Sequence, residues 1–221
     1  MTTETESYLE AIAHLPAGST LILTEVSWDE YEQLLDDLGD CYGVNIFYNQ
    51  GRLEIMSPSS NHEMYADLIL HIGRRTADET GSEFESRGST TFKQKKMRKA
   101  AEPDTCFYVQ NAQRIIGVER IDLKSDPPPD VVVEVDVSHD PSAKSSFYAA
   151  IGVPELWRYN ESQLRIFHLV EGHYLEKPAS RSFPILTAEA LAQFLQQSKT
   201  QGQTAALRSF RAWLHEKMEV K

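Results

Sequence analysis

PPDVVVEVDVSHDPSAKSSFYAAIGV, residues 128–153, has the most distinctive pattern in the chain. Its five valines between residues 131 and 137 predict a β-strand that is buried on both faces. Asp130, Glu134 and Asp136 fall within or beside this run, and the alternation of side chains along a strand puts all three on one face. An ionised carboxylate inside a sheet is costly unless a cation or hydrogen-bond donors compensate it. The functional question is therefore what compensates Glu134.

A helix is expected directly after this strand. Asp140 and Pro141 are typical of an N-cap followed by the first helical residue. The helix would run to Ile151 and end at Gly152. Lys144 falls one turn into this helix, where it is either a solvated surface lysine or a cation that reaches the strand.

The N-terminal part of the chain predicts a strand, a capped helix and a hairpin. Residues 20–26 are typical of a strand, and Ser27 with Glu30 forms a capping-box pattern for a helix over residues 28–39. Two short apolar segments flank the Asn-Gln-Gly sequence at residues 49–51, which is a hairpin signal.

The remaining sequence predicts a long helix, further strands and a helical tail. The long helix has an apolar stripe along one face and a glycine at its end. These elements are expected at residues 61–80 (the helix), within 82–110 and between 155 and 178 (strands), and from 187 onward (the tail).

The composition is that of a soluble globular protein. The 221 residues allow one main domain, and we expect a leader at 1–19, a domain at 20–186 and a packed helical extension at 187–221. No apolar run approaches the ~20 residues that span a bilayer, and the polar, acidic N-terminus is unlike a secretory signal. Cys41 and Cys106 form no metal or redox motif, so a cytoplasmic location with free thiols is expected.

Two acids on predicted strands are candidate metal ligands. Asp104 follows a proline at the start of one strand, and Glu134 lies within the next. If these strands are adjacent, the two carboxylates can hold a hard cation such as Mg²⁺, and Lys144 can orient water or a phosphate. Asp130 also follows a proline, but it lies ~13 Å along the strand from Glu134, so a turn role is expected for it.

Positive charge is concentrated in one short run. The chain has a net charge of -11, which argues against a general nucleic-acid binder, and without this run the rest carries -16. The run is either a solvated hairpin tip or a surface that contacts phosphates. Its basic residues are Lys93, Lys95, Lys96, Arg98 and Lys99.

The block that follows the valine strand resembles a known family pattern. Its order and spacing are similar to the hallmark of the Uma-two family of restriction-endonuclease-like proteins, part of the PD-(D/E)XK nuclease superfamily. The N-terminal helix and hairpin, the first long helix and the Pro-Asp strand agree with it, so that the resemblance covers roughly residues 24–195. The block consists of Glu134-Val135, Asp140, Lys144, Tyr148 and the sequence GVPELW at 152–157.

The resemblance implies an α/β restriction-endonuclease-like fold, with a mixed central sheet flanked by helices, an N-terminal hairpin and C-terminal helices. It implies Asp104 and Glu134 as metal ligands, with the main-chain carbonyl of Val135 as a third. Lys144 would replace the lysine that the superfamily keeps on the strand, and Glu63 would be an auxiliary acid. The implied activity is Mg²⁺- or Mn²⁺-dependent cleavage of DNA by an endonuclease, and a homodimer is expected because two strands must be cut.

Some features depart from this pattern or have a structural explanation. Asp136 stands where the superfamily has its lysine, and the loop before Lys144 is shorter than the family pattern. Ser60 and Glu63 match a capping box, and Tyr148 can simply pack on the sheet or hydrogen-bond to it. Two other functions therefore stay open: a catalytically inactive protein that binds nucleic acid or a protein partner, and a metal-dependent hydrolase of a small phosphorylated metabolite.

Overall fold

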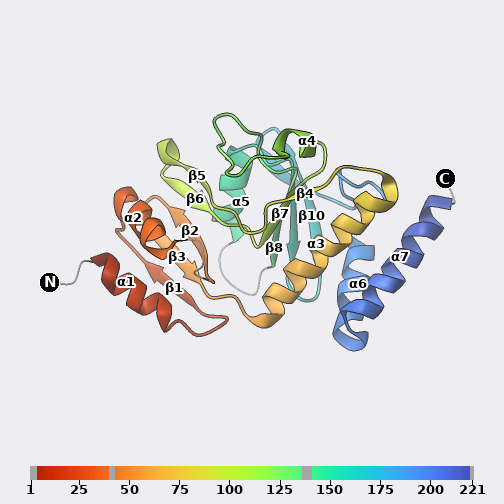
Figure 1. The fold of residues 1–221 in the computed structure, drawn as a ribbon, viewed down its shortest axis with the longest axis horizontal. Helices are drawn as coiled ribbons and strands as arrows, with labels where there is room; N and C mark the ends of the chain where they lie inside the picture. The colour runs from red at the N-terminus through yellow and green to blue at the C-terminus, as the bar shows by residue number, and fades with distance from the viewer. Residues whose placement is uncertain (1–3, 40–42, 136–140, 220–221) are drawn as a thin grey trace. The chain divides into compact units, whose positions relative to one another are not determined.

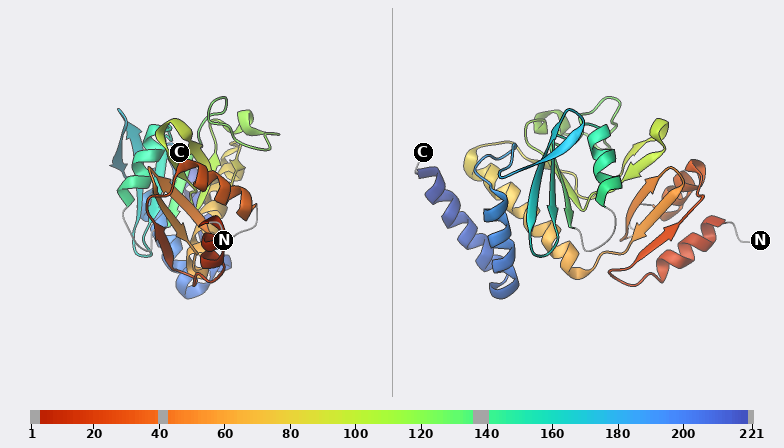
Figure 2. Two further views of the ribbon diagram at one scale, coloured as in Figure 1. Left: turned by 90° about the vertical axis from the view of Figure 1, so that its left-hand side faces the viewer. Right: turned by 180° about the vertical axis from the view of Figure 1, so that it is seen from behind.

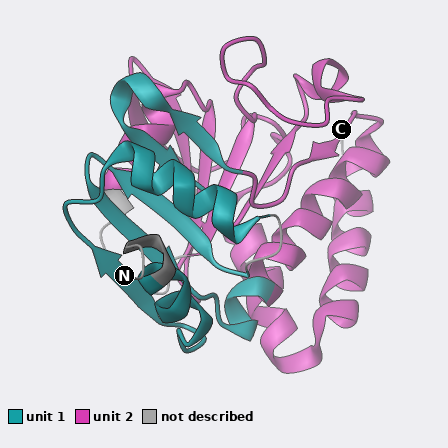
Figure 3. Ribbon diagram, turned by 60° about the vertical axis from the view of Figure 1, so that its left-hand side comes forward, with its two compact units in different colours: residues 1–63, 91–102 teal, residues 64–90, 103–221 magenta. Residues whose placement is uncertain are grey.

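The computed structural model describes three stretches of the chain, which divide into two compact units (Figures 1 and 3). The described stretches are residues 4–39, 43–135 and 141–219. Unit 1 comprises residues 1–63 and 91–102, and unit 2 comprises residues 64–90 and 103–221. The three-part division expected from the sequence stays a prediction. Among the described residues, no helix combines the length and apolar character needed to cross a membrane.

Unit 1 is built on an antiparallel sheet with helices beside it. Within the described residues this sheet has five strands in the order β1-β3-β2-β6-β5. Tyr31 and Tyr48 stack at 4.8 Å between ring centroids, and Trp28 packs against both. The elements of unit 1 are α1 (Glu4–Ala13), β1 (Thr20–Leu23), α2 (Trp28–Leu38), β2 (Asn45–Asn49), β3 (Arg52–Met56), β5 (Phe92–Gln94), the 3₁₀ turn η1 (Lys95–Met97) and β6 (Lys99–Ala101).

Two local predictions are confirmed in unit 1. Ser27 and Glu30 form the expected capping box at the start of α2, with the Ser27 N–H donating to Glu30 Oε2 at 2.6 Å. Gln50 and Gly51 join β2 to β3, both with positive φ, which is the backbone of a type I′ turn and explains the glycine. The strand expected at 20–26 is shorter, because β1 ends at Leu23.

Residues 91–102 join unit 1, although they are far from its other strands in the sequence. β6 pairs with β2 and β5 pairs with β6, which extends the N-terminal sheet. The buried Glu102 carboxylate anchors this segment, since it accepts the Ile46 N–H at 2.8 Å and the Thr91 hydroxyl at 2.6 Å. The strand segments expected within residues 82–110 are thus divided between two sheets.

Unit 2 contains a mixed sheet of six strands in the described residues, in the order β11-β10-β9-β8-β7-β4. β8 and β9 are parallel, and the other neighbouring pairs are antiparallel. Its elements are α3 (Ser60–Thr80, whose first turn belongs to unit 1), β4 (Glu85–Ser86), β7 (Thr105–Tyr108), α4 (Ala112–Ile115), β8 (Val131–Val135), α5 (Pro141–Ala150), β9 (Glu155–Tyr159), β10 (Leu164–Val170), β11 (His173–Lys177), α6 (Ala188–Gln201) and α7 (Gln203–Glu219).

The valine strand β8 is buried over its whole length, as expected. Val131, Val133 and Val135 pack in a core with apolar side chains of α3, α6 and α7. Alternation turns Val132 and Glu134 to the opposite face of the sheet. Figure 2 shows α3 and α6 on one side of this sheet and α5 on the other. Glu134 therefore faces α5.

The start of α3 corrects one prediction. The expected capping box used Ser60 as the cap, with Glu63 as its partner. Ser60 lies inside the helix, and the side chain of Ser59 instead accepts the His62 N–H at 3.3 Å. The cap is therefore shifted by one residue.

Candidate active site

Glu134 is the centre of the candidate site. Its side chain is 6% exposed, and both carboxylate oxygens are hydrogen-bonded to side chains of α5. Lys144 Nζ donates to Oε2 at 2.8 Å, and the Tyr148 hydroxyl donates to Oε1 at 2.6 Å. Lys144 and Tyr148 are four residues apart, a spacing that places both on one face of a helix. The helix that follows the strand thus compensates the acid within it.

Asp104 approaches Glu134 from the neighbouring strand. β7 and β8 pair with Thr105 opposite Val133, so Asp104, one residue before β7, lies beside Glu134. Asp104 Oδ2 accepts the Val135 N–H at 2.5 Å, which fixes this carboxylate against the end of β8. The structure therefore brings Asp104, Glu134 and Lys144 together within unit 2.

The surroundings of Glu134 oppose its ionisation. Burial raises the pKa of Glu134, the Lys144 ammonium lowers it and the charge of Asp104 raises it, which together give a pKa of about 7. Burial also raises the pKa of Tyr148 well above its usual range, and the Glu134 carboxylate adds to this shift. Tyr148 therefore stays a neutral donor, whereas Glu134 titrates close to neutral pH. Carboxyl groups with strongly shifted pKa values are common at catalytic sites.

Arg158 is a further candidate that the sequence did not single out. β8 and β9 are parallel with Glu134 opposite Arg158, and paired residues of neighbouring strands point to the same face. The half-buried Arg158 therefore lies next to Glu134 on the α5 side of the sheet. The available signal was a lone arginine inside the apolar strand ELWRY.

Two other buried acids of unit 2 have structural explanations. Asp130 accepts the N–H groups of Val109 and Asn111 at 2.8 and 2.9 Å, which agrees with the turn role expected for it. Glu155 accepts the Trp157 indole N–H and two main-chain N–H groups, those of Arg181 and Ser182. Because those main-chain donors belong to the fold itself, these two carboxylates need no ligand.

Sequence comparison identifies the family. The model of the Uma2 family, described as "Putative restriction endonuclease", matches residues 28–199. The chain belongs to the Uma2 family. The curated proteins, by contrast, include no match to the sequence.

A solved structure supports the same fold. It is described as "a putative nuclease belonging to DUF820 from Anabaena variabilis" and aligns with a TM-score of 0.53 at 13% identity. The alignment covers 77% of this chain and 99% of that chain. At this identity the likeness concerns the fold alone, and it confirms the restriction-endonuclease-like class predicted from the sequence.

The other predicted site residues of this Uma2 member belong to unit 1, and their roles stay predictions. Glu63 is exposed in the first turn of α3. In the basic run, Lys93 and Lys95 each lie 3.3 Å from a carboxylate oxygen of Glu32 on α2. Arg98 donates to the Tyr48 hydroxyl at 3.5 Å. Part of the positive charge of the run is thus offset by α2, while Lys96 is exposed. Asp136 and Asp140 lie outside the described residues.

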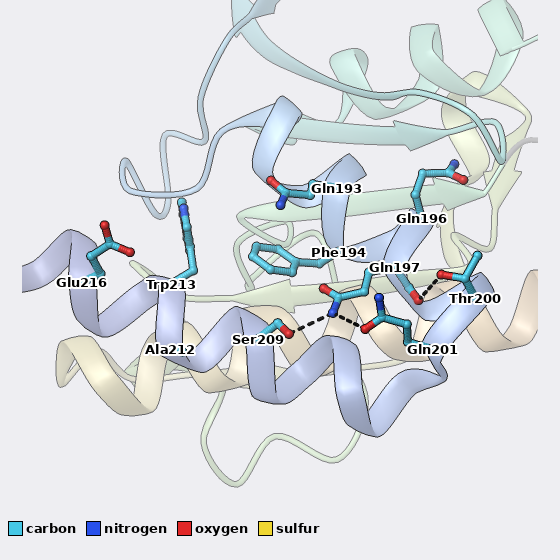
Figure 4. Close-up of a pocket in the computed structure, with 10 residues that line it drawn as sticks. All are labelled: Gln193, Phe194, Gln196, Gln197, Thr200, Gln201, Ser209, Ala212, Trp213 and Glu216. Carbon is cyan, nitrogen blue, oxygen red and sulfur yellow. Dashed lines mark hydrogen bonds between the residues drawn. The ribbon is translucent and has the colours of Figure 1, made fainter.

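A pocket lies between α6 and α7 in unit 2 (Figure 4). It is lined mainly by amides and hydroxyls, with Gln197 donating to Ser209 at 2.8 Å and to Gln201 at 2.9 Å. None of its lining residues is one of the site residues predicted from the sequence.

The donor set around Glu134 suits a hard divalent cation. Among the described residues no three His, Cys, Asp or Glu side chains are grouped to hold a metal. Mg²⁺ commonly uses one or two carboxylates and completes its shell with waters and substrate oxygens. Asp104 and Glu134 meet that need, and the buried Glu134 already requires a positive charge beside it, which Lys144 supplies.

Proposed function

We propose that this Uma2 member is an endonuclease that hydrolyses phosphodiester bonds of DNA with the help of Mg²⁺ or Mn²⁺. The proposal depends chiefly on one observation, the meeting of Asp104, Glu134 and Lys144 at the end of β8. Two carboxylates can hold a metal ion that assists phosphodiester hydrolysis, and a lysine beside them can stabilise the developing charge. The family and the fold of the chain agree with a nuclease.

Each residue has a role that follows from its position. Asp104 and Glu134 would hold the cation, with the Val135 carbonyl as a third ligand. When bound, such a cation lowers the pKa of a water molecule and stabilises the negative charge that develops on the phosphate. Lys144, with a side chain 23% exposed, can orient a water molecule or a phosphate oxygen. Arg158 would add a planar donor for phosphate beside Glu134.

The test is cleavage of plasmid and linear DNA with Mn²⁺ or Mg²⁺ by the full chain and by two variants. Glu134→Ala removes a cation ligand and Lys144→Ala removes the group that orients water or phosphate, so each should lower the rate by about 100-fold or more. Lys124→Ala, an exposed lysine of unit 2, is the matched control and should cleave like the wild type.

Other outcomes would point to the alternative functions. If the wild type and both variants leave every DNA substrate and bis(p-nitrophenyl) phosphate intact, the enzyme proposal fails and a binding protein remains. If the wild type hydrolyses bis(p-nitrophenyl) phosphate but no DNA, the small-molecule hydrolase is supported instead.

A further inference from the structure

We propose that Tyr148 is a positioning residue that fixes Glu134 through Oε1, so that Oε2, held by Lys144, is the oxygen offered to a divalent cation. This inference rests on the proposed function and assigns a different role to each carboxylate oxygen of Glu134. Lys144 and the cation would then occupy the same oxygen in turn, while the Tyr148 hydrogen bond persists.

The two partners of Glu134 differ in mobility. Tyr148 is fully buried, and its hydroxyl lies 2.6 Å from Oε1. A tyrosine ring enclosed in this way has two side-chain torsions, both restricted by its neighbours. The Lys144 side chain is partly exposed and has a flexible four-carbon stem. The contact that can be released is therefore the one at Oε2.

The two partners also differ in charge. A phenol donates a hydrogen bond without neutralising the carboxylate, so Glu134 keeps its negative charge for a cation. The Lys144 ammonium supplies the positive charge that a buried carboxylate needs. A divalent cation at Oε2 would repel an ammonium at 2.8 Å from the same oxygen, so the two would exchange rather than coexist.

The position of Tyr148 in the helix supports this role. Lys144 and Tyr148 are one turn apart on α5, so the fixed contact and the exchangeable contact come from the same rigid element. Hydrogen bonds to a metal-binding carboxylate typically change metal affinity by about 10–100-fold when they are removed. Tyr148 should therefore influence cation binding without touching the cation.

The test is Mn²⁺ binding to the full chain without DNA, measured by isothermal titration calorimetry and by electron paramagnetic resonance of unbound Mn²⁺. Tyr148→Phe should weaken binding by about tenfold. Lys144→Met should bind Mn²⁺ more tightly than the wild type, because the competing ammonium is removed, and Glu134→Ala should abolish binding. Tyr174→Phe is the matched control, because the Tyr174 hydroxyl donates to the Val153 carbonyl at 2.9 Å, just after α5, and does not contact Glu134.

The outcomes separate this inference from the proposed function. If Glu134→Ala abolishes binding but Tyr148→Phe binds like the wild type, the positioning role is wrong and the proposed metal site stands. A Lys144→Met variant that binds no more tightly than the wild type would overturn the exchange at Oε2. If the wild type does not bind Mn²⁺, or Glu134→Ala binds normally, both proposals fail.

A measurement on the wild type does not depend on how the variants fold. In nuclear magnetic resonance spectra recorded during a Mg²⁺ titration, the Lys144 side-chain signal should shift while the buried Tyr148 hydroxyl proton stays protected from exchange. Loss of the Tyr148 proton signal at saturating Mg²⁺, with the Lys144 signal unchanged, would overturn the inference.

Discussion

Glu134 is a buried carboxyl group that destabilises the fold when it is ionised, and it is also the proposed metal ligand. Burial in β8 raises its pKa, and because Lys144 offsets only part of this shift, the pKa is about 7. Folding therefore favours the protonated carboxyl, while a metal ligand must be ionised. Such a residue is expected to lower the stability of the fold in return for function.

The stability of the wild type should therefore fall as the pH rises through the range in which Glu134 titrates. In the unfolded chain Glu134 loses its proton near the ordinary glutamate pKa of 4.5, and in the folded chain near 7. Between these values the folded state binds more protons, so the free energy of unfolding decreases with pH, by at most ~3 kcal/mol. Glu134→Gln removes this loss and should raise the melting temperature more at pH 8 than at pH 5.

Thermal melts at several pH values measure this difference directly. Glu119→Gln, at an exposed carboxylate, should show a difference from wild type that changes little over the same range. A Glu134→Gln variant whose gain in melting temperature is the same at pH 5 and pH 8 would contradict the prediction.

At the scale of single elements, α7 is attached to α3 by a charged cluster. Glu79 on α3 accepts hydrogen bonds from His215 at 2.8 Å and from Arg211 at 3.1 Å. The hydrogen bond from His215 lowers the pKa of Glu79, with a smaller contribution from Arg211. A lowered pKa means that the contribution to stability is present above the unfolded pKa and is lost as the pH falls through the folded pKa.

Glu79→Gln should therefore loosen the C-terminal turns of α7 at neutral pH. Hydrogen exchange of residues 211–219 should accelerate by less than about fivefold, because the Arg211 and His215 side chains are exposed and exposed pairs are weak. The difference from the wild type should disappear in acid, once Glu79 is protonated. Asp78→Asn, an exposed carboxylate one residue away, is the control and should leave the exchange of α7 unchanged.

The elements that could be predicted are those fixed by local chemistry. Ser27 and Glu30 define a helix start, Gly51 a two-residue turn, and the valines of β8 a buried strand, because each signal lies within a few residues. The pairing of β6 with β2 could not be predicted, since the strands are short and lie about 50 positions apart. It became evident only from the long-range contacts of Glu102.

The candidate site could be predicted in part for the same reason. Asp104, Glu134 and Lys144 follow from the motif, and the structure brings them together. The sequence could not show whether Tyr148 hydrogen-bonds to Glu134 or only packs on the sheet, because residue spacing does not fix how the helix is rotated about its axis. Arg158 depends on the parallel register of β8 and β9, which no local signal gives.

At the scale of the whole molecule, the distribution of charge bears on the proposed binding of DNA. The chain has a net charge of -11, and within unit 1 Glu32 pairs with two of the lysines of the basic run. A phosphate backbone would have to replace these ion pairs. The acidic helix α2 should therefore reduce the affinity of the basic run for nucleic acid.

Two substitutions should shift DNA affinity in opposite directions. Lys96→Ala removes an exposed charge of the basic run and should weaken DNA binding. It should also reduce the slope of log binding constant against log salt concentration by about one. Glu32→Gln frees Lys93 and Lys95 from their ion pairs and should strengthen binding. Fluorescence anisotropy with a labelled duplex at several salt concentrations measures both effects. If neither variant differs from Lys124→Ala, the basic run does not contact DNA.

The connection β8–α5–β9 has a consequence for how this site can vary among relatives. Glu134, Lys144, Tyr148 and Arg158 all come from one continuous segment of the chain, and Asp104 comes from a neighbouring strand. Lys144 and Tyr148 share one helix, so an insertion or deletion before α5 displaces both of them together. A change in loop length among relatives can therefore be accommodated by a rigid shift of α5. Loss of α5, by contrast, would remove the Lys144 ammonium and the Tyr148 hydroxyl together.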